Sequence, residues 1–207
     1  MSDLDPRARP LHRSDLKPDP LVQFELWLAQ THTGGEGAPQ AVALATATPD
    51  GRPSVRMVLL RDASRRGFSF FSSYESRKGR ELEHNPRAAL CFYWHELGRQ
   101  ARVEGRVERL DTAESDAYFA SRPEGARLSA VVSRQSEVVA GRAELEQAVA
   151  DLRDRLEGKD PPRPKHWGGW LVVPDEYEFW QHREDRLHDR FRYRLDDGAW
   201  VIERLAP

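Results

Sequence analysis

Several features that define common protein classes are scarce or absent in this chain of 207 residues. Its one cysteine, Cys91, excludes a disulfide within the chain and a zinc site built from thiolates. No apolar run approaches the length needed to cross a bilayer, so we expect no membrane association. The opening MSDLDPRARP lacks the basic and then apolar pattern of a secretory signal. We therefore expect a protein of the reducing cytoplasm.

The chain also lacks a charge bias and the commonest nucleotide and hydrolase motifs. With 32 Lys and Arg against 34 Asp and Glu, its formal net charge is -2, which argues against a general nucleic-acid binder. It has no G-x-G-x-x-G, no Walker-type glycine loop and no G-x-S-x-G elbow, so a Rossmann dehydrogenase is not expected. The seven histidines never fall at H-E-x-x-H spacing, and we assign no metal. Small phosphorylated ligands remain open.

Length and composition favour a single domain. Hydrophobic residues, at 39%, are sufficient for one core, and a chain of this length has little room for two. We expect an arm over residues 1–17 that is mobile unless it docks, and one domain over 18–207. Asp19 and Pro20 mark the start of a helix, and the clearest helical stripe runs over 142–157.

Strand patterns recur along the chain, and each is short. Two strands around the turn TPDG are indicated over 40–61, and a third over 68–73. AALCFYW has the continuous apolar character of a buried strand, with Cys91 as a small core residue, whereas RQARVEGRVERL alternates like a strand with one wet face. WLVV, EYEFW, RFRYRL and AWVIERL follow. The pattern predicts six to eight strands and three or four helices, a β-rich α+β fold with a closed or partly closed barrel and flanking helices.

Basic residues in neighbouring segments are candidates for a phosphate site. Arg56 interrupts an apolar strand, so its guanidinium is either a ligand-binding fork or half of an internal ion pair. Arg77 and Lys78 lie in the first turn of a helix that Ser76 is expected to cap, where N–H groups and the helix dipole favour an anion. Arg61 adds a further cation. Taken alone, SRKGR is more often a solvated helix face.

Two further segments carry groups that can bind an oxyanion. In AYFASRP, Tyr118 and Arg122 are four residues apart on one predicted helix, so the phenol and the guanidinium can reach the same ligand. VSRQSE contributes Gln135 and Ser136 in a predicted loop. The plainer interpretations are a core tyrosine and a capped turn.

The segment EFWQHREDRLHDRFRY carries the densest positive charge. Arg186, His188 and Arg190 alternate, which on an extended segment points all three to one side. Such a concentration is costly unless an anionic, planar ligand shares the space, and Trp180 offers an aromatic wall nearby. The alternative is a salt-bridge ladder with the acidic residues Glu184, Asp185 and Asp189.

These segments carry a family resemblance. The chain contains, in the order found in the pyridoxine/pyridoxamine 5′-phosphate oxidases, the segments RMVLLRD, SRKGRELEHNPRAAL, YFASRP, VSRQS, HWGGW, EFWQ and RLHDRF. It resembles this family over about residues 18–207. The resemblance implies a homodimeric split β-barrel with two FMN molecules at the subunit interface, each in contact with both chains.

The resemblance also implies which residues form the sites. The FMN contacts would be Arg56, Met57, Val58, Leu59, Leu60, Arg61, Phe71, Ser72, Arg77, Lys78, Gln100, Gln135, Ser136, Trp180 and Arg190. The substrate phosphate would contact Arg61, Tyr118 and Arg122. The substrate ring would lie against Arg186, Leu187 and His188, of which Arg186 and His188 would be catalytic.

The implied reaction converts pyridoxine or pyridoxamine 5′-phosphate into pyridoxal 5′-phosphate. A hydride would pass from C4′ of the substrate to N5 of the flavin, and O2 would accept the electrons and form H2O2. Arg186 would orient the substrate, and His188 would form a hydrogen bond with its ring hydroxyl.

Three positions depart from the family pattern. Arg61 stands where the family usually has lysine, which keeps the charge but replaces a point donor by a fork. Ala126 replaces a serine that contacts the substrate phosphate, so one hydrogen bond worth about 1 kcal/mol is missing. The N-terminal segment lacks the R-R-x-Y lid motif and offers only Arg7 and Arg9 in its place.

Other functions fit parts of the pattern. A phenazine-biosynthesis oxidase of the same fold would act on larger tricyclic carboxylates, and the missing lid and serine would suit a roomier pocket, whereas Tyr118, Arg122 and RLHDR suit a small phosphorylated ring. A non-catalytic flavin or B6-phosphate carrier would not need Arg186 or His188. A nucleic-acid-binding barrel is disfavoured by the charge balance.

Overall fold

The structure, a computed structural model, describes residues 9–31 and 40–207. Within these residues lie nine β-strands and five α-helices, more than the sequence pattern predicts. The additional elements include strand β3 (Asp62–Ser64) and helix α4 (Glu124–Val132). Three residues are too few to show a period, and Pro123 at the start of α4 provides no capping side chain, so neither element carried a recognisable signal.

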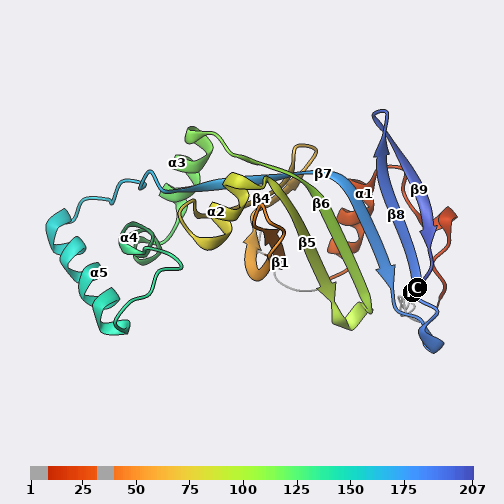
Figure 1. The fold of residues 1–207 in the computed structure, drawn as a ribbon, viewed down its shortest axis with the longest axis horizontal. Helices are drawn as coiled ribbons and strands as arrows, with labels where there is room; N and C mark the ends of the chain where they lie inside the picture. The colour runs from red at the N-terminus through yellow and green to blue at the C-terminus, as the bar shows by residue number, and fades with distance from the viewer. Residues whose placement is uncertain (1–8, 32–39) are drawn as a thin grey trace.

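All nine strands join one antiparallel sheet that curls into the open half-barrel visible in Figure 1. Its path runs β2-β1-β5-β6-β7-β4-β3, while β8 pairs with β7 and β9 pairs with β8. The strands, besides β3, are β1 (Gln40–Ala47), β2 (Pro53–Leu60), β4 (Gly67–Ser73), β5 (Arg87–Trp94), β6 (Arg99–Arg109), β7 (Trp167–Gln181), β8 (Asp189–Asp196) and β9 (Ala199–Leu205).

The long strand β7 organises the sheet. It pairs with β6 along most of its length, with β4 through its first half and with β8 through its second half. The sequence pattern predicts two separate strands here, WLVV and EYEFW, with Pro174 between them. They are continuous because Pro174 lies opposite Gly105, where the β6–β7 register shifts, and the bulge accommodates the missing proline N–H.

Three helices begin at the capping residues that the sequence predicts. Helix α1 (Pro20–Ala29) starts after Asp19, whose side chain accepts a hydrogen bond from the N–H of Leu21. Helix α2 (Arg77–His84) starts after Ser76, and α3 (Thr112–Ser121) after Asp111. The apolar face of α1 fills the concave side of the sheet, because the fully buried Phe24 packs edge-on against Phe68 and Phe92.

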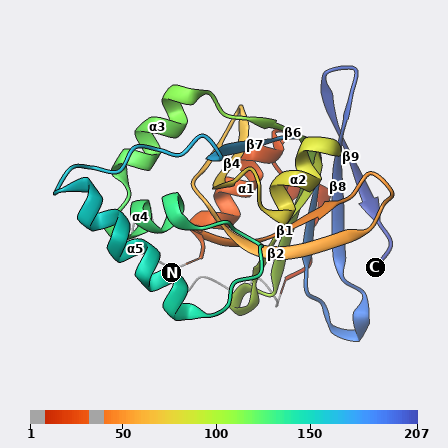
Figure 2. The same ribbon diagram turned by 60° about the vertical axis from the view of Figure 1, so that its left-hand side comes forward.

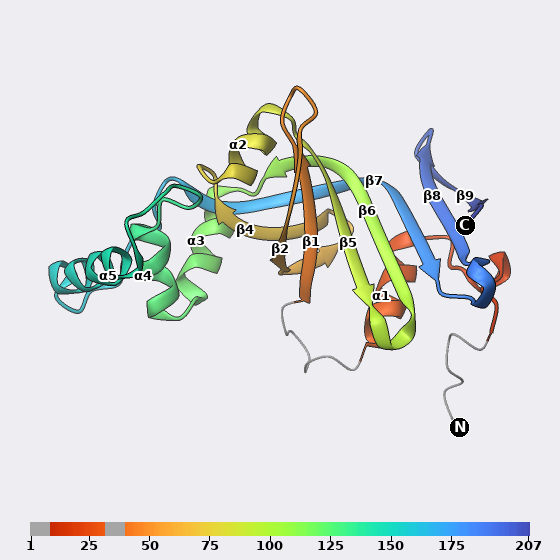
Figure 3. The same cartoon turned by 60° about the horizontal axis from the view of Figure 1, so that its bottom comes forward.

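The remaining helices gather at one end of the molecule. Figures 1, 2 and 3 show α3, α4 and α5 (Arg142–Leu156) together, far from the β8–β9 hairpin at the opposite end. None of the residues of α5 is fully buried, although its apolar stripe lies beside α4. The α4–α5 connection, 133–141, is the loop that the sequence predicts for VSRQSE.

The described part of the expected N-terminal arm docks on the sheet. Leu11 and Leu16 are buried in the main core. The N–H of Leu11 donates to Oδ2 of Asp189, and the Tyr193 hydroxyl donates to the carbonyl of Lys17. Residues 9–17 therefore pack against β8, and residues 1–8 lie outside the described residues.

Two strands leave one apolar face uncovered in the single chain. β5 was expected to be buried throughout, but its burial alternates: Phe92 is buried, Cys91 is half-buried and Tyr93 is 58% exposed. Cys91 is therefore not a fully buried core residue. On β2, at the end of the sheet path, Val55 and Met57 are 68% and 62% exposed. Large exposed apolar side chains in a row on an edge strand are typical of a surface that another chain covers.

Candidate functional site

A cavity of about 580 Å³ lies between β2, β4, α2 and α3. It brings together most of the residues that the resemblance assigns to the cofactor and the substrate phosphate: Arg56, Met57, Val58, Leu59, Arg61, Phe71, Ser72, Arg77, Lys78, Tyr118, Arg122, Gln135 and Ser136. Sequence reasoning missed three lining residues, namely Ser54, Val55 and Trp167.

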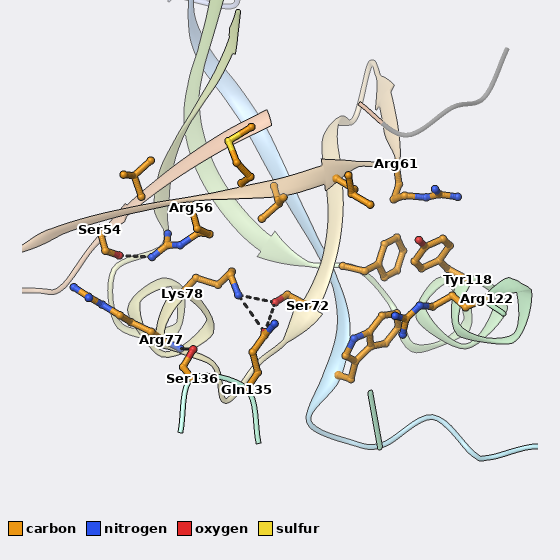
Figure 4. Close-up of a pocket in the computed structure, with 16 residues that line it drawn as sticks. Ser54, Arg56, Arg61, Ser72, Arg77, Lys78, Tyr118, Arg122, Gln135 and Ser136 are labelled. Carbon is orange, nitrogen blue, oxygen red and sulfur yellow. Dashed lines mark hydrogen bonds between the residues drawn. The ribbon is translucent and has the colours of Figure 1, made fainter. Parts of the chain in front are cut away.

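The basic side chains of this cavity form two separate groups. Figure 4 shows Arg56, Arg77 and Lys78 at one end, and Arg61 with Arg122 at the other. We call the first group the α2 end and the second the α3 end. The cavity therefore has two positively charged ends with apolar side chains of β2 between them.

Lys78 is the buried cation of the α2 end. Its side chain is 8% exposed, and its Nζ donates to Ser72 Oγ at 3.0 Å, to Gln135 Oε1 at 3.1 Å and to Ser76 Oγ at 3.3 Å. All three acceptors are uncharged. Burial, reinforced by the nearby Arg56, lowers the pKa of Lys78 to about 8. Because none of these hydrogen-bond acceptors carries a negative charge, the ammonium can still attract an anion.

The two arginines of the α2 end meet at a carboxylate. Glu81, one turn after Arg77 on α2, accepts a hydrogen bond from Nε of Arg77 at 2.9 Å and lies 3.3 Å from a terminal nitrogen of Arg56. The internal ion pair expected as one interpretation of Arg56 is therefore confirmed, and the same side chain also lines the cavity. Sequence reasoning missed Glu81, although its spacing of four from Arg77 was a usable signal.

The loop between α4 and α5 closes the α2 end. Gln135 Oε1 accepts a hydrogen bond from Ser72 Oγ at 2.9 Å, and Ser136 Oγ accepts one from the backbone N–H of Arg77 at 3.1 Å. Ser136 adopts a positive φ of 78°, an uncommon conformation for a non-glycine residue that clusters at functional sites. Both loop residues thus form hydrogen bonds with residues that line the cavity, rather than forming only a capped turn.

At the α3 end, aromatic rings support the cations. The guanidinium carbon of Arg61 lies 4.6 Å from the centre of the Tyr118 ring, and that of Arg122 lies 4.7 Å from the Trp167 ring. The Nη1 atom of Arg122 is buried and has no hydrogen-bond partner among the described residues. Burial lowers the pKa of Arg122. A buried donor without an acceptor is costly, and an anionic ligand would supply the acceptor.

A second cavity, of about 650 Å³, lies near the other end of β7. It brings together Arg186, His188 and Trp180, whose ring lies 4.6 Å from that of His188. Its other lining residues, His182, Arg183, Glu184 and Asp185, were not predicted. Trp167 and Trp180 are thirteen positions apart on β7, roughly 40 Å along an extended strand, so the two cavities are separate within one chain.

The protonation of the His188 ring follows from its hydrogen bond with the backbone of Arg183. Its Nδ1 accepts a hydrogen bond from the N–H of Arg183 at 3.1 Å, so Nδ1 carries no proton. Burial, together with the neighbouring His182 and Arg186, lowers the pKa of His188. The neutral ring then carries its proton on Nε2, and that atom is available as a donor.

The predicted alternation of Arg186, His188 and Arg190 is wrong. Residues 184–186 form a tight turn in which Arg186 has a φ of 62°, and β8 begins only at Asp189. Arg190 is on β8, where both its Nε and NH2 donate to the buried Glu178, so it does not line the second cavity. The alternative, a salt-bridge ladder with Glu184, Asp185 and Asp189, does not include Arg190, which pairs with Glu178 on β7, while Asp189 pairs with Arg183 and Arg204.

Other predicted residues lie outside the first cavity, and of these only Trp180 lines the second. Leu60 is buried, because it ends β2 on the core side, and Leu187 is 70% exposed. Gln100, Trp180 and Arg190 are paired in register across β6, β7 and β8, so they form one row at the β8 end of the molecule.

The departures from the family pattern also have a place in the structure. Ala126 is in α4 and does not line the cavity, whereas Arg61 does. Arg7 lies outside the described residues, and Arg9 pairs with Asp15 at 3.0 Å. Among the described residues, no group of His, Cys, Asp and Glu has the arrangement of a metal site. No helix in the described ranges is long and apolar enough for a membrane span.

Two family models match the chain. Residues 35–155 match the model described as pyridoxamine 5′-phosphate oxidase. Residues 167–207 match the model described as the pyridoxine 5′-phosphate oxidase C-terminal dimerisation region. The two matches include both cavities and the β8–β9 hairpin.

Known relatives agree with this assignment. The chain is 50% identical over 198 residues to a pyridoxine/pyridoxamine 5′-phosphate oxidase of Nostoc sp., covering 95% of this chain and 92% of the relative. It is 52% identical over 198 residues to the enzyme of that name from Cupriavidus pinatubonensis, covering 95% and 93%. Among solved structures, PhzG from Burkholderia lata 383, in complex with tetrahydrophenazine-1-carboxylic acid, superposes with a TM-score of 0.86 at 34% identity, covering 96% and 98%. The chain therefore belongs to the pyridoxine/pyridoxamine 5′-phosphate oxidase family, with its split β-barrel fold.

Proposed function

We propose that the protein is an FMN-dependent oxidase that converts pyridoxine 5′-phosphate or pyridoxamine 5′-phosphate into pyridoxal 5′-phosphate with O2 as acceptor. The observation that carries the proposal is the pair of cationic ends in one cavity. The α2 end holds Lys78 without a charged hydrogen-bond acceptor, and the α3 end holds Arg122 with a buried donor that lacks a partner among the described residues. Two phosphorylated ligands side by side would satisfy both ends.

The α2 end fits the phosphate of FMN. Arg56, Arg77 and Lys78 supply positive charge, and Ser72 and Ser136 supply hydroxyl groups beside the first turn of α2. The helix dipole adds to this attraction. The outward-facing strand β2 would lie along the flavin, with Met57, Val58 and Leu59 as its lining residues in the cavity. Bound FMN would supply the chemistry of the site by accepting a hydride from the substrate.

The α3 end fits the phosphate of the substrate. Arg61 and Arg122 are both held on aromatic faces, which leaves their N–H groups free of carboxylate partners there. The Tyr118 phenol lies at the same end and can donate a further hydrogen bond. Arg61 presents a planar fork in place of the usual lysine, which suits bidentate phosphate binding.

The second cavity would complete the site from a partner subunit. Its residues lie too far along β7 to reach the first cavity of the same chain, while the matched dimerisation region includes them. The uncovered apolar row on β2 supports burial against a second copy. In this homodimer, Arg186 and His188 of one protomer, with Gln100, Trp180 and Arg190 at the same end, would face the flavin and substrate held by the other.

The residues of the second cavity then have defined tasks. Arg186 would orient the substrate ring, and Nε2 of His188 would donate to its ring hydroxyl oxygen, as the Arg183 contact requires. Trp180 would wall the ring from water. Holding C4′ in a reactive position is the main catalytic contribution that such side chains can make.

A phenazine-type oxidase is a second candidate, favoured by the superposition with PhzG. The two candidates differ in what the α3 end must hold. A ring phosphate offers three terminal oxygens to Arg61, Tyr118 and Arg122 together, whereas the carboxylate of a tricyclic compound offers only two. The phosphate at this end is therefore the better match.

The test is a spectrum followed by an assay. The purified protein should show flavin absorbance, and adding pyridoxine 5′-phosphate in air should produce aldehyde and H2O2 in equal amounts. A tetrahydrophenazine carboxylic acid added in the same way tests the second candidate. A non-catalytic carrier would keep the flavin spectrum and turn over neither compound. A colourless protein that binds no FMN would contradict the proposal.

A further inference from the structure

A buried carboxylate joins two structural elements at the α2 end. Glu81 is 4% exposed and does not line the cavity. Its Oε1 accepts from Arg77 on its own helix, and its Oε2 lies 3.3 Å from Arg56 on β2. One side chain therefore fixes the positions of two arginines that come from different elements.

Two hydroxyl groups complete this arrangement. Thr46 on β1 and Ser54 on β2 each donate to Oε2 of Glu81 at 2.5 Å. Both hydroxyl oxygens in turn accept hydrogen bonds from the guanidinium of Arg56. Burial alone would raise the pKa of Glu81, but the bonds from Ser54, Thr46 and Arg77 outweigh it and lower the pKa to about 2. Glu81 is thus a carboxylate at any physiological pH.

We propose that Glu81 is a positioning residue for the cofactor phosphate: it holds Arg56 and Arg77 in the arrangement in which they bind that phosphate, without touching the ligand. The inference rests on the proposed function, which places the phosphate of FMN at the α2 end. Of the two arginines, Arg77 depends on Glu81 more, because its exposed side chain donates to no other acceptor among the described residues, whereas Arg56 also donates to Thr46 and Ser54.

If Glu81 only neutralised the two arginines, its removal would change FMN binding in the opposite direction. A negative charge beside a phosphate site repels the phosphate, so a carboxylate that merely balanced the arginines would weaken binding, and its removal would strengthen it. If Glu81 positions the arginines, its removal weakens binding even though the site becomes more positive.

The experiment compares FMN with riboflavin, which lacks the phosphate. Wild-type and Glu81→Gln apoproteins, both full-length, are titrated with each flavin, and binding is followed by fluorescence. For each protein, the ratio of the dissociation constants for riboflavin and FMN isolates the contribution of the phosphate. We expect Glu81→Gln to bind FMN about tenfold more weakly and riboflavin within about twofold of the wild type, a loss of phosphate preference typical of a charged hydrogen bond removed. An unchanged ratio, or a tighter FMN complex, would overturn the proposal.

Glu83→Gln is the matched control. Glu83 lies two residues further on α2, is exposed and pairs with Arg109 at 2.7 Å, so its removal changes the same charge on the same helix away from the site. It should keep the wild-type ratio. If Glu81→Gln does not fold, Thr46→Val carries the same test, because it removes one donor to Glu81 and one acceptor of Arg56, with a smaller expected loss of about threefold. No loss of phosphate preference in Thr46→Val would then overturn the proposal.

A double substitution tests whether Glu81 acts through Arg77. In an Arg77→Ala background, Glu81→Gln should change the FMN preference less than it does in the wild type, because one of its two arginines is already gone. Equal effects in both backgrounds would show that Glu81 does not act through Arg77. If the wild type itself showed no preference for FMN over riboflavin, the phosphate site of the proposed function would fail first, whatever the variants did.

Discussion

Arg122 lies over the indole of Trp167, with its guanidinium carbon 4.7 Å from the ring centre. The plane of the Tyr118 ring, which supports Arg61, is tilted by only 13° from that of Trp167. The two cations of the α3 end are therefore oriented by aromatic faces. Because aromatic support does not neutralise a guanidinium as a carboxylate would, both arginines keep their charge for a ligand.

Trp167→Leu is expected to weaken substrate binding. Loss of a cation–π contact costs about 0.5 to 2 kcal/mol, so the KM for pyridoxine 5′-phosphate should rise roughly 2- to 30-fold. Trp167→Phe keeps an aromatic face and should show a smaller rise. Steady-state kinetics with the flavin-saturated variants measure the effect. Trp200→Leu serves as a control. Trp200 is a half-buried tryptophan that contacts Tyr177 in the main core, so its replacement should leave KM unchanged. Equal KM values for wild type and Trp167→Leu would remove Trp167 from the site.

The lowered pKa of Lys78 predicts a pH dependence of FMN binding. In the empty site the pKa is about 8, so Lys78 loses its proton as pH rises above that value. A bound phosphate favours the protonated form, hence binding takes up a proton above about pH 8 and affinity falls by up to about tenfold per pH unit. Apoprotein stability has the opposite slope: it rises between about 8 and the ordinary value of 10.5, because the unfolded chain binds more protons there.

Two controls isolate Lys78 in this experiment. Lys78→Arg keeps its charge across the range, so its FMN affinity should stay flat up to about pH 10. Riboflavin binding to the wild type should also stay flat, since it has no phosphate to pair with the ammonium. Wild-type FMN affinity that did not change between about pH 7 and pH 9.5 would contradict the phosphate contact of Lys78.

A site shared between protomers predicts complementation. Arg122→Ala and Arg186→Ala should each be inactive as homodimers while Arg186→Ala retains the flavin. In a mixed dimer, one of the two sites receives an intact Arg122 from one chain and an intact Arg186 from the other. Random 1:1 mixing gives half mixed dimers with one intact site each, so activity should recover to about a quarter of the wild type.

The control for complementation pairs two residues of one cavity. Arg61 and Arg122 line the same end of the same cavity. In a mixed dimer of Arg61→Ala and Arg122→Ala, one protomer's cavity lacks Arg61 and the other's lacks Arg122, so both sites are damaged. That mixture should stay inactive. If Arg122→Ala and Arg186→Ala also failed to complement while size-exclusion chromatography showed mixed dimers, each site would belong to a single chain.

How much the sequence predicts differs between the two cavities. The first could be assembled from local signals: Asp111 and Ser76 cap the helices that carry Tyr118 and Lys78, and the structure confirms both caps. The family resemblance added the order of the segments. Of the residues it missed, Glu81 had a local signal in its spacing from Arg77, but its contact with Arg56 on β2 and the contact of Trp167 with Arg122 join different elements and leave no trace in a local pattern.

The second cavity shows why the alternation of Arg186, His188 and Arg190 in the sequence did not predict where their side chains lie. Alternating residues share a side only on an extended segment. Positive φ angles at Asp185 and Arg186 turn the chain just before β8, so only Arg190 follows the strand. The sequence held no glycine at this turn to signal it. Local strain at a cavity is a tertiary effect, and it becomes visible only when the neighbouring strands are in place.

Glu178 predicts a stability difference on the same sheet. Its side chain is 2% exposed, and it receives Arg190 from β8 and Arg102 from β6 at 2.8–3.1 Å. Glu178→Gln leaves Arg190 without its counter-ion, and leaves Arg102 only the more distant Glu104 at 3.4 Å. Breaking a fully buried pair costs about 3–5 kcal/mol, and the partial exposure of the arginines reduces our expectation to about 2 kcal/mol, or roughly 4–8 °C in Tm.

Glu203→Gln on β9 is the comparison that decides this interpretation. Glu203 pairs with Arg192 at 2.7 Å, but its side chain is 37% exposed, so the loss should stay within about 0.5 kcal/mol. Both variants remove one carboxylate from an arginine on β8, and they differ mainly in burial. Calorimetry of the two apoproteins should therefore show a large drop in Tm for Glu178→Gln alone. Equal drops would mean that the lost charge, and not the desolvated pair between β6, β7 and β8, sets the stability of this end of the molecule.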